Sequence, residues 1–387
     1  MKNILFVIPA FTVGGTNTSL ISLLPYIDRE KYKVSVYAMN PSGPMGYEIA
    51  KYGTVINKLG EAAAENTAAG SKALTRTVLK AIKKCLGFIG VDLTPIYYRK
   101  QVRELSKTPY DCVIAFQEGE ATRFVQYFKN VRKAAWVRSD YSRFLSITNS
   151  KPEKDLYREF DIIVNVSENA LHSFLHVMPD FKEQSIFIYN LVNSERIINL
   201  SKIDSEHSFP LSEFIIVSLG RIDKVKHFSE IPGIALKLKK HGIIFRWHII
   251  GGATVRYPEE YEALKKCIEN YELQNQVILL GHQPNPYPLL ARSNILVCLS
   301  ESETFNHTFA EARTLGVPVL SVNYPGAEEI LGHNNGGLIT TRDSISETLE
   351  NLISDKALYN RLKQQAGAFS YDNQAQLDKL YDLVFER

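Results

Sequence analysis

A chain of 387 residues is too long for one compact core, and a typical domain of about 150 residues predicts two or three domains, of which we take two. Hydrophobic residues make up 45% and charged residues 22%, a globular composition that excludes wholesale disorder. No run approaches the ~20 apolar residues of a membrane span, and the start lacks a signal peptide's features, so we expect a cytoplasmic protein. Its four cysteines are scattered singly, which excludes a zinc motif or redox pair and argues against a disulfide framework.

The net charge of +3 is spread unevenly along the chain. Residues 70–107 include nine basic and two acidic residues, so this segment carries +7 and the remainder −4. General nucleic-acid binding needs a broadly basic surface, whereas this distribution indicates one local patch. We therefore predict no nucleic-acid partner.

In chain order, short apolar runs rich in β-branched residues alternate with helix-like segments. In the first half these runs lie at 4–8, 34–37, 112–116, 134–137 and 162–166. Residues 195–213 are polar and lack a sustained period, which is typical of a connector. The alternation then restarts at 214–219, 247–250, 277–280, 295–299 and 317–322, and the end of the chain, 355–387, reads as helix.

This alternation predicts an α/β fold of two Rossmann-like, doubly wound parallel-sheet domains that face each other across a cleft. In such sheets, ligands bind at the carboxyl ends of the strands. Residues that follow predicted strands are therefore the first candidates for a site.

The segment 300–320 follows a buried-type strand and ends at a Gly-Val-Pro break. A helix should begin near Asn306, with Glu303 ahead of it and Glu311 more than one turn inside, so that both carboxylates face the strand-end crevice. Amides from Phe305 to Thr308 would offer the donors and partial positive charge that an anionic phosphate needs. An equal alternative is that two glutamates at this spacing occur by chance on a solvated helix edge.

Two other strand ends carry candidate residues. The strand at 214–219 runs into Gly220, Arg221 and Lys226, and an arginine fork with a lysine charge suits a leaving diphosphate. A solvated surface cluster of lysine and arginine is the alternative.

The first strand is followed by Gly14 and Gly15, which let backbone approach a ligand closely but often form only a turn. No Gly-x-Gly-x-x-Gly is present, which disfavours a dehydrogenase.

Nearly the whole chain resembles the family-4 retaining glycosyltransferases, which have the GT-B fold. The most specific matches are the family's Gly-Arg with a lysine five residues after the arginine, its two glutamates separated by seven residues, and its Gly-x-Pro-Val. Here these are Gly220, Arg221 and Lys226, then Glu303 and Glu311, then 316–319. Weaker matches at 14–15, 136–140, 166–167 and 189–190 follow the family's order.

The resemblance implies a division of labour along the chain. Residues 1–195 would form an acceptor-side domain, 196–213 a linker, 214–365 the nucleotide-sugar donor domain, and 366–387 a helix that returns to the first domain.

It also implies roles for individual side chains. Glu311 would hold the nucleotide's ribose hydroxyls, Glu303 would contact the donor sugar, and Arg221 with Lys226 would stabilise charge on the departing diphosphate. The implied catalytic residues are Glu303, Arg221 and Lys226. The implied donor-binding residues are Gly15, Gly220, Gly281, His282, Phe305, Asn306, His307, Thr308 and Glu311, and on the acceptor or sugar side they are Gly14, Thr16, Asn17, Arg138 and Asp140.

Three residues depart from the family pattern. Thr304 and Asn306 stand where the family usually has glycines, although asparagine tolerates left-handed backbone and caps helices well. Arg138 stands where many relatives have a histidine, which leaves open what contacts the sugar or acceptor on that side. An arginine there is able to bind an anionic sugar or a phosphate.

The activity implied is retaining transfer from a nucleotide-diphosphate sugar, a UDP-sugar rather than a GDP-sugar, to a glycan or lipid-linked acceptor in bacterial surface or capsular polysaccharide synthesis. No two aspartates lie two positions apart, so the metal-binding Asp-x-Asp is missing and we predict no metal or other cofactor. The alternatives are a non-catalytic nucleotide-sugar-binding subunit or a GT-B nucleotide-sugar epimerase. A glycoside hydrolase fits least, since cations at a strand end imply a phosphate leaving group.

The basic segment reads as an amphipathic helix over 72–89. Its apolar residues fall on one stripe and its lysines and arginines opposite. One interpretation is a peripheral contact with the inner face of the cell membrane, which would present a lipid-linked acceptor. The other is a helix that packs on the sheet with its lysines in solvent.

Overall fold

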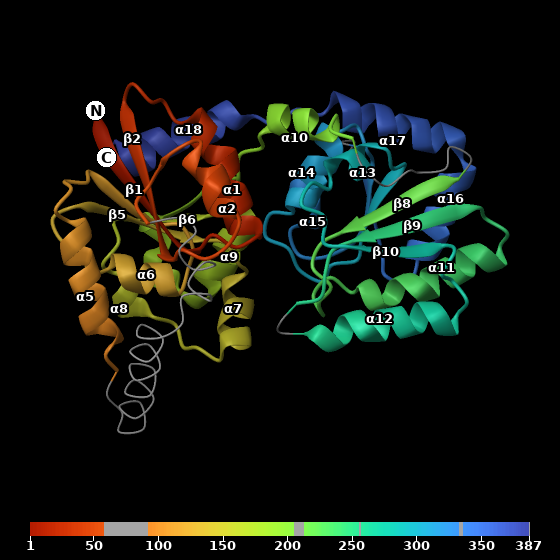
Figure 1. Cartoon of the computed structure of the whole chain (residues 1–387), viewed down its shortest axis with the longest axis horizontal. Coiled ribbons are helices and arrows are strands. Elements are labelled where there is room, and N and C mark those ends of the chain that lie inside the picture. The colour runs from red at the N-terminus through yellow and green to blue at the C-terminus, as the bar shows by residue number, and fades with distance from the viewer. Residues whose placement is uncertain (58–91, 205–212, 255–256, 333–335, 387) are drawn as a thin grey trace, which may run out of the picture. The chain divides into compact units, whose positions relative to one another are not determined.

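The computed structural model describes residues 1–57, 92–204, 213–254, 257–332 and 336–386, so the predicted helix at 72–89 lies outside the described residues. The chain divides into two compact units. Unit 1 comprises Met1–Leu191 with Asn373–Arg387, and unit 2 comprises Val192–Asp372. Each contains one sheet with helices packed against it (Figure 1), which confirms the predicted α/β class with two parallel sheets.

Unit 1 has a seven-stranded sheet in its described residues, in the order β3-β2-β1-β4-β5-β6-β7. Every neighbouring pair is parallel. The strands are β1 (Lys2–Ala10), β2 (Tyr32–Asn40), β3 (Thr54–Val55), β4 (Cys112–Ala115), β5 (Arg132–Val137), β6 (Ile162–Asn165) and β7 (Ser185–Phe187).

Two helices of unit 1, α7 (Tyr141–Thr148) and α9 (Glu168–Val177), start at a side chain that caps them. Asp140 accepts a hydrogen bond from the amide of Arg143 at the start of α7, and Ser167 does the same for Ala170 at the start of α9. The described helices are α1 (Gly15–Leu23), α2 (Met45–Ala50), α5 (Thr94–Leu105), α6 (Glu120–Val125), α7 (Tyr141–Thr148), α8 (Lys154–Tyr157), α9 (Glu168–Val177) and α18 (Asn373–Leu380).

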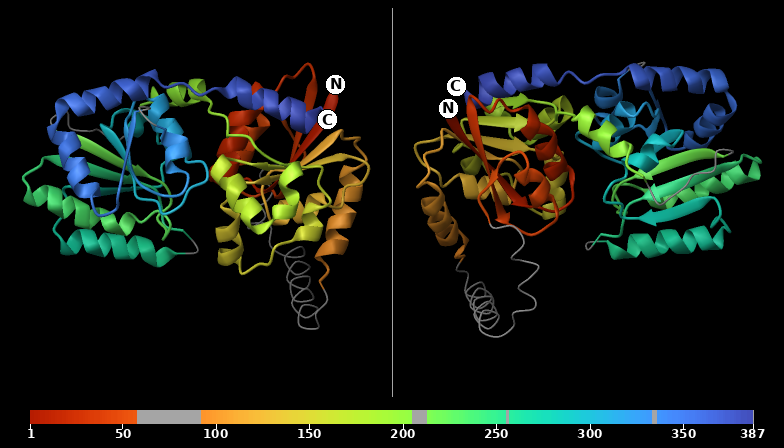
Figure 2. Two further views of the ribbon diagram at one scale, coloured as in Figure 1. Left: turned by 180° about the vertical axis from the view of Figure 1, so that it is seen from behind. Right: turned by 45° about the horizontal axis from the view of Figure 1, so that its top comes forward.

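The end of the chain packs beside its beginning (Figure 2). The Lys2 ammonium lies 2.9 Å from the Glu386 carboxylate, and the Arg132 guanidinium donates to the carbonyls of Leu383 and Val384 at 2.7 and 2.8 Å. The residues that return to unit 1 therefore begin at Asn373 rather than at position 366.

Unit 2 has a six-stranded parallel sheet in its described residues, in the order β10-β9-β8-β11-β12-β13. The strands are β8 (Phe214–Leu219), β9 (Phe245–Ile250), β10 (Val277–Gly281), β11 (Ile295–Cys298), β12 (Val319–Val322) and β13 (Gly337–Thr340). The described helices are α10 (Ser194–Ser201), α11 (Ile231–Lys240), α12 (Pro258–Asn270), α13 (Tyr287–Ala291), α14 (His307–Thr314), α15 (Ala327–Leu331), α16 (Ile345–Ser354) and α17 (Lys356–Ala368).

Two features of this fold differ from the sequence-based expectation. The predicted linker at 196–213 contains most of helix α10, whose Ile197 is buried against unit 2 although the segment as a whole is polar. Strands β3, β7 and β13 were not predicted. They lie at sheet edges and none of their residues is fully buried, so they lack the buried apolar run that marks the predicted strands.

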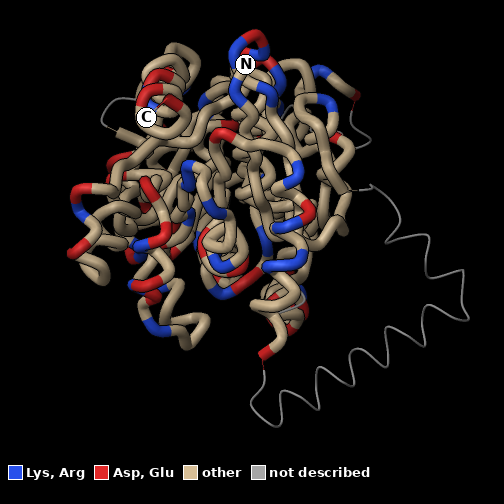
Figure 3. Tube along the Cα trace, turned by 90° about the vertical axis from the view of Figure 1, so that its left-hand side faces the viewer, with Lys and Arg blue, Asp and Glu red and all other residues tan. Residues whose placement is uncertain are grey.

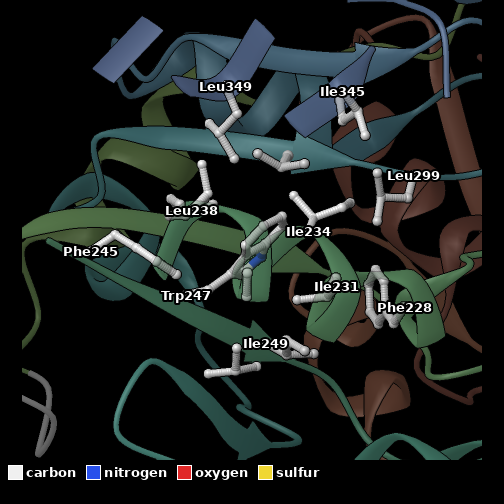
Figure 4. Packing of buried hydrophobic residues seen from close by; sticks show 14 of the residues in the cluster. Phe228, Ile231, Ile234, Leu238, Phe245, Trp247, Ile249, Leu299, Ile345 and Leu349 are labelled. Carbon is white, nitrogen blue, oxygen red and sulfur yellow. The ribbon is translucent and has the colours of Figure 1, made fainter. Parts of the chain in front are cut away.

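The core of unit 2 surrounds Trp247 on β9, with residues from α11 and α16 around it (Figure 4). The indole nitrogen of Trp247 donates to the Ser218 hydroxyl at 3.0 Å, and that hydroxyl donates to the Val297 carbonyl at 2.7 Å. Both side chains are fully buried, so the relay satisfies two polar groups inside an apolar core.

Lysine and arginine are interspersed with aspartate and glutamate along the described chain (Figure 3).

Cys112, Cys267 and Cys298 are free thiols, and the first and last of them are buried. Cys85 lies outside the described residues. In the part of the chain that the structure describes, no helix combines the length and apolar character that crossing a membrane requires.

Replacing Ser218 with alanine should leave the Trp247 indole nitrogen buried without an acceptor. We expect a loss of about 1 to 3 kcal/mol in the unfolding free energy of unit 2. Trp247 fluorescence during urea unfolding in a Trp136→Phe background would measure it, because the only other tryptophan, in unit 1, is then removed. Ser229→Ala, at an exposed position of the same unit, should change stability by less than about 0.5 kcal/mol. Equal effects in both variants would contradict this role.

Candidate functional site

The candidate site of unit 2 lies between the carboxyl ends of β8 and β11, a place that we call the strand-end crevice. These strands are neighbours, but the chain leaves them toward opposite sides of the sheet, which is the arrangement that forms binding crevices in parallel α/β sheets. The loop after β8 carries residues 220–226, and the loop after β11 carries 299–306. The amide of Glu301 donates to the carbonyl of Val225 at 2.9 Å and ties the two loops together.

Lys226 and Glu303 meet across this crevice. Their charged groups lie 2.6 Å apart, and their side chains are only 15% and 18% exposed. Burial alone would lower the pKa of the Lys226 ammonium, but the Glu303 carboxylate opposes it, and the net effect raises that pKa. The turn is fixed by Asp223, whose carboxylate accepts from the amides of Val225 and Lys226. The structure therefore brings together two of the predicted catalytic residues.

Arg221, the third predicted catalytic residue, lies differently. Its side chain is 71% exposed and forms an ion pair with Asp223 at 3.3 Å. Asp223 is buried, so it holds the guanidinium at the edge of the turn. The structure thus places Arg221 on the same turn as Lys226 but shows no contact between its guanidinium and Glu303 or Glu311.

Helix α14 begins where the sequence predicted. Asn306 is its N-cap, and the Asn306 side-chain oxygen accepts from the amide of Thr308 at 3.1 Å and from the Thr308 hydroxyl at 2.7 Å. The expectation of a free amide is therefore wrong for Thr308, because the cap already bonds it. On either side of Asn306, the rings of Phe305 and His307 pack edge to face.

Glu311 is buried inside α14 with 8% of its surface exposed. The Tyr287 hydroxyl donates to its Oε1 atom at 3.2 Å. Burial raises the pKa of the Glu311 carboxyl to about 7, while the Tyr287 hydrogen bond and the positive charges of Arg196 and Lys226 oppose that rise. The positive charge of Lys226 therefore acts on the Glu311 carboxyl within unit 2.

The remaining donor-side candidates line the ends of β9 and β10. A Cβ on Gly251 would lie 1.7 Å from the Gly220 carbonyl oxygen, so only glycine permits this approach of two strand ends. Gly281 has a φ of +66°, which favours glycine, and its carbonyl accepts from the Gly251 amide at 2.9 Å. His282 follows it and packs beside Gly252.

Unit 1 repeats the crevice at the ends of β1 and β4. Gly14 and Gly15 open α1, and the Thr16 hydroxyl donates to the Gln117 side chain at 3.0 Å across the two loops. Asn17 was predicted on the acceptor side, but it is 3% exposed and its amide donates to the carbonyls of Ala10 and Thr12. It therefore holds the loop before α1.

Arg138 belongs to a half-buried polar cluster of unit 1. Its guanidinium donates to the Asn190 side chain at 2.6 Å and lies 4.5 Å from the centre of the Phe116 ring. Glu118, which is 3% exposed, accepts from the Arg138 amide at 2.8 Å and from the Ser139 hydroxyl. Desolvation lowers the pKa of Arg138, and Glu118 opposes that effect. The neighbouring Asp140 is occupied as the cap of α7 and as the acceptor of the Ser173 hydroxyl.

Several polar residues near these sites were missed by sequence reasoning. Glu118 lies three residues after the end of β4, so the rule that sites gather at strand ends would have found it. Tyr287 and Arg196 lie on helices far from Glu311 in sequence, and no spacing rule points to them. A hollow of about 430 Å³ lies away from all of these residues, beside the amino-terminal end of β2, and is lined by Met1, Arg29, Tyr32, Lys33, Val34, Ala50, Tyr52, Gly53 and Thr54.

Comparison with known proteins gives the context of this geometry. Residues 201–368 match the family described as glycosyl transferases group 1. A relative from Campylobacter jejuni, N-acetylgalactosamine-N,N'-diacetylbacillosaminyl-diphospho-undecaprenol 4-alpha-N-acetylgalactosaminyltransferase, is 24% identical over 92% of each chain. The capsular polysaccharide biosynthesis glycosyltransferase CapM of Staphylococcus aureus is 25% identical over 51% of this chain and 53% of its own.

Solved structures resemble the chain over almost its whole length. A glycosyltransferase from Rickettsia africae has a TM-score of 0.71 at 17% identity and covers 100% of this chain and 99% of its own. Anabaena HepE in complex with UDP and glucose has a TM-score of 0.70 at 19% identity and covers 94% and 93%. The predicted GT-B fold is confirmed, and so is the prediction of a glycosyltransferase.

Replacing Glu311 with glutamine should stabilise unit 2 at alkaline pH. The pKa of the Glu311 carboxyl is raised from 4.5 to about 7 in the folded state. The free energy of unfolding is therefore highest below the unfolded-state pKa, and it falls as pH rises through the folded-state pKa. The variant escapes this loss, so at pH 8 we expect it to gain up to about 3 kcal/mol, and almost nothing at pH 4. Trp247 fluorescence in the Trp136→Phe background would report the unfolding of unit 2 at both pH values.

The matched control for that measurement is Glu347→Gln on α16, whose side chain is exposed. It should change stability by less than about 0.5 kcal/mol at either pH. A Glu311→Gln variant that is less stable than the parent at pH 8 would contradict a desolvated carboxylate.

Proposed function

We propose that this GT-B glycosyltransferase is a retaining, metal-independent enzyme of the kind grouped in family 4, and that it transfers a sugar from a UDP-sugar. The observation that carries the proposal is the pair of Lys226 and Glu303 at 2.6 Å, with the buried Glu311 beside it at the same strand-end crevice of unit 2. The Lys226 cation suits the diphosphate, and the Glu303 carboxylate suits the sugar. The buried Glu311 carboxylate suits the ribose.

The bond that breaks joins the sugar's anomeric carbon to the outer phosphate oxygen. As it breaks, negative charge grows on the diphosphate, and Lys226 is placed to stabilise it while Arg221, on the same turn, adds a second positive charge. The acceptor oxygen bonds to the same face of the anomeric carbon, and its proton passes to the departing phosphate oxygen. Glu303 orients the sugar through its hydroxyls, so no protein side chain has to act as a base.

The base and acceptor are proposed from relatives. HepE was solved with UDP and with UDP-glucose, which supports a UDP-sugar donor. The Campylobacter jejuni relative is named for an undecaprenol-diphosphate-linked substrate, and CapM for capsular polysaccharide synthesis. We therefore assign a glycan or lipid-linked acceptor in bacterial surface polysaccharide assembly, at the inner face of the cell membrane. The membrane contact through 72–89 stays a prediction from sequence.

Metal independence rests on the cations at the crevice. In metal-dependent transfer, a divalent ion neutralises the diphosphate, whereas here Lys226 and Arg221 supply two positive charges at the end of β8. The absence of an Asp-x-Asp pair from the sequence agrees with this assignment.

Removing the Lys226 charge should slow donor turnover far more than it weakens nucleotide binding. After UDP-sugars are screened by thermal stabilisation, we expect Lys226→Ala to lower the rate of UDP release with the best donor by about 10²- to 10³-fold, because the charge is needed most as the bond breaks. Lys240→Ala, exposed at the end of α11, is the matched control and should keep the parent rate.

The same assay separates the alternatives. Unchanged turnover in both Lys226→Ala and Glu311→Ala would refute the site. A parent protein that binds a UDP-sugar but neither transfers nor hydrolyses it would be a non-catalytic subunit, and one that converts the sugar without an acceptor would be an epimerase.

The product's anomeric configuration should match that of the donor, and chelation should not affect the rate. Proton NMR of the initial product would show the coupling constant of the donor's anomer, and turnover in EDTA should stay within about twofold of the untreated enzyme, because Lys226 and Arg221 supply the charge. An inverted product would exclude retention. Activity lost in EDTA and restored by Mg²⁺ or Mn²⁺ would exclude metal independence.

A further inference from the structure

Glu311 is hydrogen-bonded by Tyr287, which is in turn bonded by Arg196, and the proposed chemistry gives neither side chain a role. Tyr287, on α13, is 7% exposed and donates its hydroxyl to Oε1 of Glu311 at 3.2 Å. Arg196, half-buried on α10, hydrogen-bonds the Tyr287 hydroxyl in turn. Three separate helices of unit 2 thus contribute one chain of polar contacts that ends at the carboxylate.

Other charged or titratable groups also face Glu311. They are Lys226 from the turn after β8 and Tyr371 from the segment after α17. Lys226 is engaged with Glu303, and the Tyr371 oxygen accepts a hydrogen bond from Arg313. Tyr287 differs from both, since it donates directly to a Glu311 oxygen.

The contact orients the carboxylate as well as stabilising it. A carboxylate oxygen accepts up to two hydrogen bonds, and the hydrogen bond from Tyr287 to Oε1 restricts rotation of the group and leaves Oε2 as an acceptor. A ribose diol donates two hydroxyl protons, so it needs an ionised acceptor. Removing the Tyr287 hydroxyl favours the protonated form, since burial already raises the pKa of Glu311 to about 7.

We propose that Tyr287 and Arg196 are positioning residues that keep Glu311 ionised and correctly turned to accept hydrogen bonds from the nucleotide's ribose hydroxyls. The inference rests on the proposed function, in which Glu311 binds the ribose. In this inference, Tyr287 and Arg196 set the selectivity for a ribonucleotide although neither contacts the nucleotide.

The test compares UDP with 2′,3′-dideoxy-UDP by calorimetry on the full chain between pH 6 and pH 9. We expect the parent to favour UDP by at least about tenfold at pH 8, with the preference falling as pH drops through about 7. In Tyr287→Phe the preference should be reduced by up to about fivefold at pH 7 and recover toward pH 9, because its midpoint rises by about one pH unit. Arg196→Met should raise the midpoint of the preference in the same direction but by less. Arg196→Lys should restore most of the parent's preference for UDP.

Tyr271→Phe, at an exposed tyrosine of the same unit, is the matched control and should keep the parent's preference at every pH. If Tyr287→Phe weakens UDP and dideoxy-UDP equally at every pH, its role is merely structural and the inference is overturned. If Tyr287→Phe does not fold, as melting curves would show, the two Arg196 variants decide by the same criterion.

Failure of the proposed function would look different. If the parent does not distinguish the two nucleotides, or if Glu311→Ala keeps the distinction, Glu311 does not bind the ribose and the site assignment falls. If Glu311→Ala abolishes the distinction while Tyr287→Phe and Arg196→Met keep the parent's preference at every pH, only the positioning role falls.

Discussion

The burial of one carboxylate, Glu311, constrains the chemistry of unit 2. An ionised carboxylate taken out of water is stable only if donors and positive charges replace the water. Here Tyr287 supplies a hydrogen bond, and Arg196 and Lys226 supply positive charge. Lys226 is itself neutralised by Glu303, so the two carboxylates and two cations form one linked set. A ligand that brings a diphosphate would compete with Glu303 for Lys226 and change the balance around Glu311.

Helix α14 is anchored on both sides of that carboxylate. Asn306 caps its start, and Arg313, two residues after Glu311, is 1% exposed. The Arg313 guanidinium donates to the carbonyls of Ile330 and Leu331 and lies 3.9 Å from the centre of the Phe369 ring. A buried arginine that is hydrogen-bonded through both terminal nitrogens fixes the helix at its carboxyl-terminal half. The position of Glu311 is therefore set by packing on both sides rather than by the helix alone.

Topology explains why both units have polar clusters in equivalent places. In each sheet the first strand of the unit lies beside its fourth in sequence order, and the loops after these strands meet. In unit 2 this pairs Lys226 with Glu303, and in unit 1 it pairs Thr16 with Gln117. Arg138 is accompanied by the buried Glu118, so its positive charge is compensated within unit 1.

The local sequence pattern determined the strands, the strand-end residues and a helix cap of this protein. All ten strands predicted from apolar runs are present, because a buried parallel strand must be apolar throughout. The strand-end rule and the fixed spacings singled out Lys226, Glu303 and Glu311, and the structure pairs Lys226 with Glu303 and sets its charge near Glu311. Asn306 was readable as a helix cap for the same reason, since a cap acts within three residues.

Only the tertiary structure decided which charges pair and which residues support them. Arg221 and Lys226 look equivalent in sequence, yet the Asp223 turn leaves one exposed and buries the other. Tyr287 and Arg196 reach Glu311 because three helices pack together, and no local period encodes a contact between segments far apart in the chain. Secondary structure and strand-end placement follow from interactions between near neighbours, whereas the partner of a buried charge depends on which distant segments the fold brings into contact.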